Sequence, residues 1–180
     1  MDVKFFIPAQ AAQQIGQLTY GAVSTALGWC YAATFNNVLC YLALSVVNSA
    51  DFDNELKRRW PKAQHQSLSN NNPELSSLVE RVLNRKIIPL ILVGTDFQQH
   101  IWRTLLKIPA GSKVSYQTLA AQAQKPKAIR AAASALANNL IAVAVPCHRV
   151  IRASGELGQY RWGVDLKRRL LAEEGCGISR

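Results

Sequence analysis

One stretch carries most of the information in this chain: Ile141-Ala142-Val143-Ala144-Val145-Pro146-Cys147-His148-Arg149-Val150. The apolar run 141–145 predicts a strand, and Pro146 restricts the backbone before it, which indicates that the strand ends there. A thiol at a strand end is placed to be presented rather than buried. Only the thiolate is a strong nucleophile, and a nearby histidine can lower the thiol pKa enough to supply it. Cys147 and His148 are therefore a candidate nucleophile and base.

Adjacent residues on a regular strand point to opposite faces. His148 can therefore serve Cys147 directly only if the chain turns there, and otherwise a water must bridge the two side chains. The alternative is a buried structural cysteine beside an unrelated histidine, because catalytic Cys-His pairs are usually distant in sequence.

Further motifs surround this stretch in a fixed order. They are Val114-Ser115-Tyr116, Lys125-Pro126-Lys127-Ala128-Ile129-Arg130-Ala131, Asn138-Asn139, Gly155, Gly158, Gln159-Tyr160-Arg161-Trp162-Gly163 and Leu170-Leu171-Ala172-Glu173-Glu174-Gly175. Together with Pro146–Val150 they resemble the O6-alkylguanine-DNA alkyltransferases, which move an alkyl group from guanine O6 in DNA onto their own cysteine. The resemblance covers roughly residues 93 to 175, and the first 90 residues resemble the family only loosely.

The resemblance implies a role for each catalytic candidate. Cys147 would be the alkyl acceptor, in a relay Glu174–His148–water–Cys147, with Asn139 holding the turn under the nucleophile. From sequence alone, Asn139 could equally be an ordinary turn residue, and a glutamate beside a C-terminal glycine is usually solvated.

The resemblance also implies a pocket for the damaged base. Tyr116 would help to turn the nucleotide outward and bind the base edge, Tyr160 would line the pocket, and the backbone amide of Arg161 would donate to O6. Pro146 and Val150 are expected to complete the pocket. By its position alone, Tyr116 could equally be a core tyrosine at the start of a helix.

Two short helices, 116–123 and 127–137, are expected around Gln124-Lys125-Pro126, which is typical of a helix-turn-helix. The second helix is rich in alanine. In the family it lies in the DNA minor groove, which is about 6 Å wide, so small side chains are what would permit a helix to enter. Arg130 matches the arginine that fills the gap left by an extruded nucleotide. The expected DNA contacts on this helix are Ala128, Arg130, Ala131 and Ser134. The alternative is an alanine-rich helix packed in a core.

The charge of the chain is unevenly distributed. Residues 1–90 hold eight Lys and Arg against six Asp and Glu, whereas residues 91–180 hold thirteen against five. With a pI near 9.8, this basic half favours a polyanionic partner, although a merely soluble basic surface has the same composition.

The patterns predict an α+β fold: a small αβ lobe with an antiparallel sheet, residues 1–92, and a mainly helical lobe, residues 93–180. Strands are expected within 19–44, with a hairpin turn at Asn36-Asn37. Expected helices cover 52–60, 73–86 (capped by Asn72), 96–108 and 165–175, with a loop over 62–72 and a short strand or connector at 87–93.

The four cysteines are too widely spaced for a disulfide framework, which favours a reducing cytoplasm. Only Cys30 and Cys40 precede Cys147, too few for the four-cysteine zinc domain of larger bacterial relatives, so the chain resembles the stand-alone bacterial type. These two cysteines are expected in the core, His65 and His100 at the surface, and no metal is expected. Cys176 is expected in a mobile tail.

No signal peptide is expected at Met1–Lys4, and residues 18–47 are interpreted as strands and turns rather than a membrane span.

The expected function is irreversible, stoichiometric repair of O6-alkylguanine, and of O4-alkylthymine, in double-stranded DNA by a cytoplasmic monomer without a cofactor. Two alternatives are a non-catalytic DNA-binding regulator and a cysteine hydrolase. Retention of Cys147 argues against the alkyltransferase-like proteins, which carry tryptophan instead.

Overall fold

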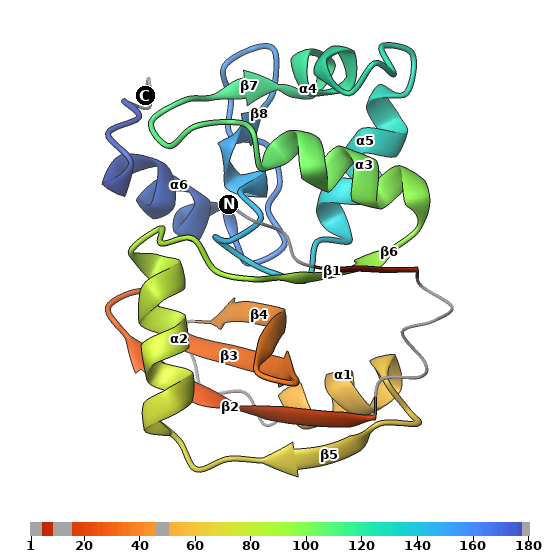
Figure 1. Ribbon diagram of the computed structural model, residues 1–180. Helices are drawn as coiled ribbons and strands as arrows, with labels where there is room; N and C mark the ends of the chain where they lie inside the picture. The colour runs from red at the N-terminus through yellow and green to blue at the C-terminus, as the bar shows by residue number, and fades with distance from the viewer. Residues whose placement is uncertain (1–4, 9–15, 46–50, 178–180) are drawn as a thin grey trace. The chain divides into compact units, whose positions relative to one another are not determined.

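The computed structural model describes residues 5–8, 16–45 and 51–177 (Figure 1). The predicted absence of a signal peptide at residues 1–4 lies outside these ranges, as do residues 46 and 47 of the apolar stretch. The chain divides into two compact units, Met1–Thr95 with Leu140–Ala144 and Asp96–Asn139 with Val145–Arg180. The fold is α+β, as predicted.

The division differs from the expected boundary between residues 92 and 93. It follows Thr95, and a later segment, Leu140–Ala144, belongs to the first unit. This segment is tied to Leu42, whose amide donates to Leu140 O at 2.9 Å and whose carbonyl accepts from Ala142 N at 2.8 Å. Backbone hydrogen bonds between residues about a hundred positions apart therefore make this segment part of the first unit, although it comes late in the sequence.

The first unit contains a four-stranded sheet of order β4-β3-β2-β5. β2 (Gln17–Thr25), β3 (Gly28–Phe35) and β4 (Val38–Ser45) are antiparallel, as expected. The β3–β4 hairpin turns at Asn36 and Asn37, both with positive φ, which is the geometry of a type I′ turn. A separate parallel pair joins β1 (Phe5–Pro8) to β6 (Ile91–Gly94).

The expected loop over 62–72 is wrong in part, because it contains strand β5 (Gln64–Ser67), which pairs with β2 in parallel. Its sequence is polar because the strand lies at the sheet edge, so no apolar pattern marks it. Helix α1 spans Phe52–Arg59, and α2 spans Pro73–Leu83. The Asn72 side chain accepts hydrogen bonds from the amides of Glu74 and Leu75, as the predicted cap requires.

The second unit contains α3 (Asp96–Leu105), α4 (Tyr116–Gln122), α5 (Ile129–Ala137) and α6 (Val164–Glu173) (Figure 1). α3 packs against α5, and the Trp102 indole donates to Ala135 O at 2.9 Å. α4 and α5 form the predicted helix-turn-helix. α5 begins two residues later than expected, because Lys125 to Ala128 form a turn closed by Ala128 N and Lys125 O.

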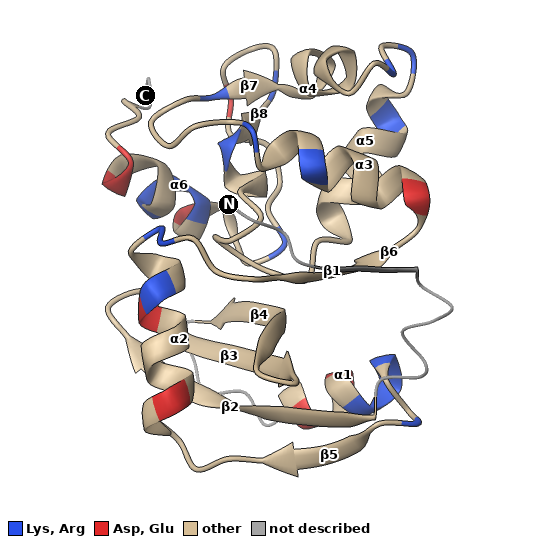
Figure 2. Ribbon diagram, in the orientation of Figure 1, with Lys and Arg blue, Asp and Glu red and all other residues tan. Residues whose placement is uncertain are grey.

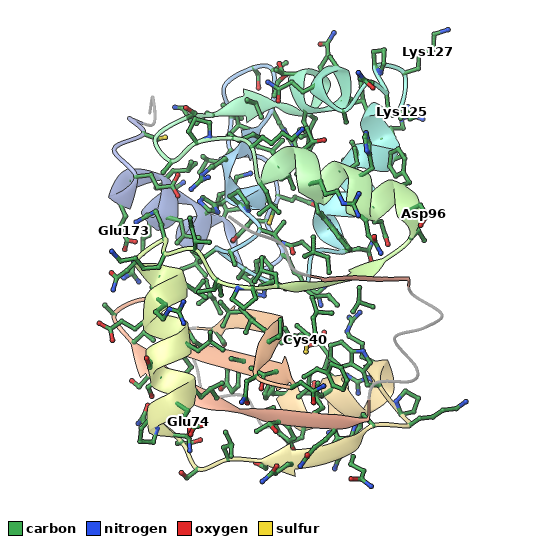
Figure 3. All side chains as sticks on the ribbon, in the orientation of Figure 1. Cys40, Glu74, Asp96, Lys125, Lys127 and Glu173 are labelled. Atoms are coloured by element: carbon green, nitrogen blue, oxygen red, sulfur yellow. The ribbon has the colours of Figure 1, made fainter. Side chains whose placement is uncertain are left out.

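The first unit buries both of its cysteines, Cys30 and Cys40, as predicted. Figure 3 shows Cys40 inside the first unit. Burial raises the pKa of the Cys30 thiol to about 11 and that of Cys40 still further. Cys176 is also buried, against Leu157 and Leu171, so its predicted place in a mobile tail is wrong. Across the described ranges, no cluster of three or more metal-ligating side chains occurs, and no helix is long and apolar enough to cross a membrane.

Candidate active site

The sequence predicted that Cys147 lies at the end of a strand, and this prediction is wrong. Within the run 141–145, Ile141 forms an isolated parallel β-bridge with Leu42. The chain then turns, and Val143 has a φ of 63°. That conformation is a genuine outlier for a β-branched residue. Cys147 opens a short 3₁₀ turn, Cys147–Arg149, and is only 4% exposed. The apolar run reflects burial in irregular backbone, which periodicity cannot distinguish from a buried strand.

Asn139 fixes this turn from the end of α5. Its Nδ2 atom lies 3.0 Å from Val145 O and 3.1 Å from the Cys147 sulfur. The amide therefore holds the turn and also donates to the sulfur, which stabilises a thiolate. Asn139 is 1% exposed, so water does not compete with these bonds.

His148 is fully buried, and its Nε2 atom lies 2.9 Å from Glu174 Oε1. Arg149 binds the same carboxylate through Nε (2.9 Å) and Nη2 (2.7 Å), and it donates through Nη1 to Ile108 O at 2.6 Å. Burial alone would raise the pKa of Glu174, but the hydrogen bonds and charges of His148 and Arg149 hold it well below its ordinary value. Glu174 is thus a buried carboxylate, not the solvated residue of the alternative interpretation.

A buried lysine also acts on the candidate nucleophile, Cys147. Lys167 is 1% exposed and donates to Val150 O at 2.6 Å and Leu157 O at 2.5 Å. Burial lowers the pKa of Lys167 to about 8. Burial raises the pKa of the Cys147 thiol, while the Asn139 hydrogen bond and the Lys167 charge lower it.

A cavity of about 360 Å³ opens over the sulfur. Of the predicted pocket residues, Tyr116, Tyr160 and Arg161 line it together with Cys147. Pro146 and Val150, which flank the 3₁₀ turn and are buried, are not among the residues that line the cavity. Sequence reasoning missed four lining residues, which are Ala133, Leu136, Ala137 and Gln159.

Strand pairing brings Tyr116 to this cavity. β7 (Val114–Ser115) pairs in parallel with β8 (Val150–Ile151), which directly follows the 3₁₀ turn. Ser115 caps α4 by accepting from Thr118 N at 2.9 Å, so Tyr116 is fixed as the first helical residue. Arg161, which also lines the cavity, donates through Nη1 to Ala137 O at 3.2 Å, at the carboxyl end of α5.

The Tyr160 hydroxyl is buried and has no hydrogen bond of good geometry within the described residues. Burial raises its pKa well above the ordinary value, and a charge on the nearby Cys147 sulfur raises it further. The hydroxyl is therefore a neutral donor beside the nucleophile.

α5 presents two different faces. Ala132 and Ala135 are buried against the unit, whereas Arg130, Ala131 and Ser134 are exposed. Ala128 is half-buried and stands at the N-cap rather than inside the helix. Figure 2 shows basic residues at the α4–α5 turn and the start of α5, and Figure 3 shows Lys125 and Lys127 projecting from that turn. The exposed face is small and basic, so the helix is not packed in the core on all sides.

Residues 96–176 match the family model of the 6-O-methylguanine DNA methyltransferase DNA-binding domain. The structure is similar to that of the Mycobacterium tuberculosis O6-methylguanine methyltransferase, with a TM-score of 0.71 and 33% identity over 88% of this chain and 93% of that one. The chain belongs to the O6-alkylguanine-DNA alkyltransferase family.

The chain is also similar to the structure of M. tuberculosis OGT in complex with DNA, with a TM-score of 0.69 and 33% identity over 87% of this chain and 92% of that one. The bifunctional transcriptional activator/DNA repair enzyme Ada of Escherichia coli is 40% identical over 159 residues. That match covers 86% of this chain but 45% of Ada, and the chain spans about half or less of the length of the first curated relatives it matches.

Sequence reasoning also missed the buried cation of this site, Lys167. A signal for it was present, because Lys167 lies three and four residues before Leu170 and Leu171 on the apolar face of α6. A lysine at such a position is rarely buried without a partner.

Proposed function

We propose that this protein repairs DNA by transferring the alkyl group of O6-alkylguanine irreversibly to its own Cys147. The observation that carries the proposal is the buried sulfur of Cys147 at a cavity lined by Tyr116, Tyr160 and Arg161. A base can reach this sulfur only after it leaves the helical stack, so we propose nucleotide extrusion as part of the reaction.

In the proposed reaction the thiol proton passes through a bridging water to Nδ1 of His148, whose charge Glu174 stabilises. The thiolate then attacks the alkyl carbon in line: the sulfur–carbon bond forms while the carbon–O6 bond breaks, and both electrons of that bond leave with guanine. The departing guanine takes up one proton, which balances the proton lost by the thiol. The reaction therefore needs no cofactor.

Donors in the cavity stabilise the leaving base. The backbone amide of Arg161 and the hydroxyl of Tyr160 are proposed to bind O6 and the base edge, and Tyr116 to close over the opposite edge. A thioether is not hydrolysed under cellular conditions, so each protein molecule acts once. O4-alkylthymine offers the same carbon–oxygen bond and is a proposed second substrate.

For DNA binding we propose that the exposed face of α5 enters the minor groove. Ala131 and Ser134 add little bulk, Ala128 stands at the entry, and Arg130 would stack in the gap left by the extruded nucleotide. The first unit is proposed to support this unit, and the protein to act as a cytoplasmic monomer. The M. tuberculosis structure with bound DNA supports the choice of ligand.

A DNA-binding regulator is the weaker candidate, because the α5 face has few side chains able to read base edges. A cysteine hydrolase would need to release its product repeatedly.

Incubation with a duplex carrying one O6-methylguanine should add a single methyl mass to the Cys147 peptide, and the reaction should then stop. The Cys147→Ala variant should bind the duplex but accept no methyl group. Multiple turnovers, or unmodified Cys147 with the lesion intact, would refute the proposal.

A further inference from the structure

A second charged pair lies beside the cavity and is not used in the reaction. Arg152 and Glu156 stand at the base of a tight loop, closed by Arg152 N to Glu156 O at 2.9 Å and Gly155 N to Arg152 O at 3.0 Å. Their side chains pair at 2.9 Å, Arg152 Nη1 to Glu156 Oε2, and are 56% and 66% exposed.

Arg152 lies next to a wall of the cavity. A Cβ atom at Gly158 would lie 3.5 Å from both Arg152 Cγ and the Tyr116 hydroxyl, so these two side chains flank the same point. Burial and the Cys147 sulfur raise the pKa of Tyr116, and the Arg152 charge opposes them. Arg152 is thus close enough to act on Tyr116, which lines the cavity with Cys147.

An extruded nucleotide brings its own charges to the cavity. The base enters, but its two flanking phosphates stay at the mouth, because the backbone is continuous with the duplex on either side. A guanidinium binds a phosphate through two parallel hydrogen bonds, whereas an exposed ion pair such as Arg152–Glu156 is weak. A phosphate can therefore displace Glu156 from Arg152.

We propose that Arg152 and Glu156 form a charge switch that binds a backbone phosphate flanking the extruded nucleotide. In free protein Glu156 holds Arg152 beside Tyr116, and in the complex the phosphate takes the place of Glu156. The ligand is a nucleic-acid phosphodiester, and the inference rests on the proposed capture of an extruded base. When DNA has no extruded nucleotide, no flanking phosphate reaches Arg152, and the negative charge of Glu156 then opposes binding of that DNA.

The test measures single-turnover alkyl transfer to the whole chain, as methylation by a short O6-methylguanine duplex and as benzylation by free O6-benzylguanine. Arg152→Ala should slow the reaction with the duplex about three- to tenfold more than the reaction with the free base. Glu156→Gln should speed the reaction with the duplex, and this gain should vanish when Arg152 is alanine. The chain offers a matched control in Arg168, which pairs with Asp165 on α6 at 2.6 Å and is 54% exposed. Arg168→Ala should change neither rate.

A neutral methylphosphonate at one flanking linkage of the lesion should make wild type and Arg152→Ala react equally, and one placed several nucleotides away should not. Equal effects of Arg152→Ala and Arg168→Ala overturn the inference, as do equal losses with duplex and free base. A gain from Glu156→Gln that persists without Arg152 also overturns it. Failure of the proposed function is distinguishable, because the wild-type protein would then gain no methyl mass at Cys147.

Discussion

Arg149 binds both carboxylate oxygens of Glu174, at 2.9 and 2.7 Å, in a pair whose carboxylate side chain is fully buried. Glu174 Oε1 also lies 2.9 Å from His148 Nε2. One carboxylate thus orients the imidazole while the guanidinium stabilises its charge. Removing either charged partner leaves the other buried without compensation.

Arg149→Ala should lower the free energy of unfolding by about 3 kcal/mol at pH 7, because a buried carboxylate loses its cation. Urea denaturation followed by circular dichroism measures this. Arg168→Ala, which removes an exposed arginine from its ion pair, should cost under about 0.5 kcal/mol. Similar losses for the two variants would contradict the buried pair.

The depressed pKa of Glu174 predicts a stability difference that depends on pH. In the fold its pKa is well below the unfolded value of about 4.3, so the carboxylate stabilises the protein above that pH. The contribution is lost as pH falls towards the folded pKa. The stability advantage of wild type over Glu174→Gln should therefore shrink below about pH 4, as measured by urea denaturation at each pH. An advantage that grows on acidification would contradict this pKa shift.

Asn139→Ala should raise the pKa of the Cys147 thiol, because the Asn139 hydrogen bond is the largest interaction that lowers it. The rate of alkyl transfer at neutral pH should fall, and its pH profile should move to higher pH. Rates over pH 6–10 with free O6-benzylguanine measure the profile without any DNA-binding step. An unshifted profile would show that Asn139 only holds the turn.

Lys167→Met should make stability less dependent on pH in alkaline solution. The folded pKa of Lys167 is about 8, below its ordinary value of 10.5, so the unfolded chain binds more protons between these values. Wild type should therefore gain roughly 3 kcal/mol relative to Lys167→Met as pH rises from 8 to 10.5. Urea denaturation of both proteins in parallel tests this, and a constant difference would contradict the lowered pKa of Lys167.

The two faces of α5 predict opposite outcomes for neighbouring alanines. Ala131→Leu adds bulk on the exposed face, so it should reduce DNA affinity at least about tenfold and leave stability nearly unchanged. Ala132→Leu adds the same atoms in the packed interior and should cost about 1–3 kcal/mol of stability. Fluorescence anisotropy with a labelled duplex and thermal denaturation separate the two effects.

Arg130→Ala should slow the repair of duplex DNA far more than the reaction with free O6-benzylguanine, because the guanidinium is proposed to fill the vacated stack, which exists only in DNA. Parallel single-turnover rates measure the ratio. Equal losses with the two substrates would remove the proposed stacking role.

Local sequence was sufficient for elements whose signals are local. Asn72 caps α2, Asn36-Asn37 makes the hairpin turn, and Ser115 starts α4, because each side chain or backbone preference acts within a few residues. The motif Pro146–Val150 likewise indicated the candidate nucleophile, Cys147. Strand β5 was missed because an exposed edge strand has no apolar alternation.

The sequence by itself therefore indicated most of the candidate site residues, and the tertiary structure decided their environment. Only the folded chain buries the Cys147 sulfur and brings Lys167 close enough to lower its pKa. Only the fold brings Glu174, 26 residues away, to His148. The physical reason is that pKa values and hydrogen-bond strength depend on desolvation and on distances between groups far apart in sequence, which no local pattern encodes.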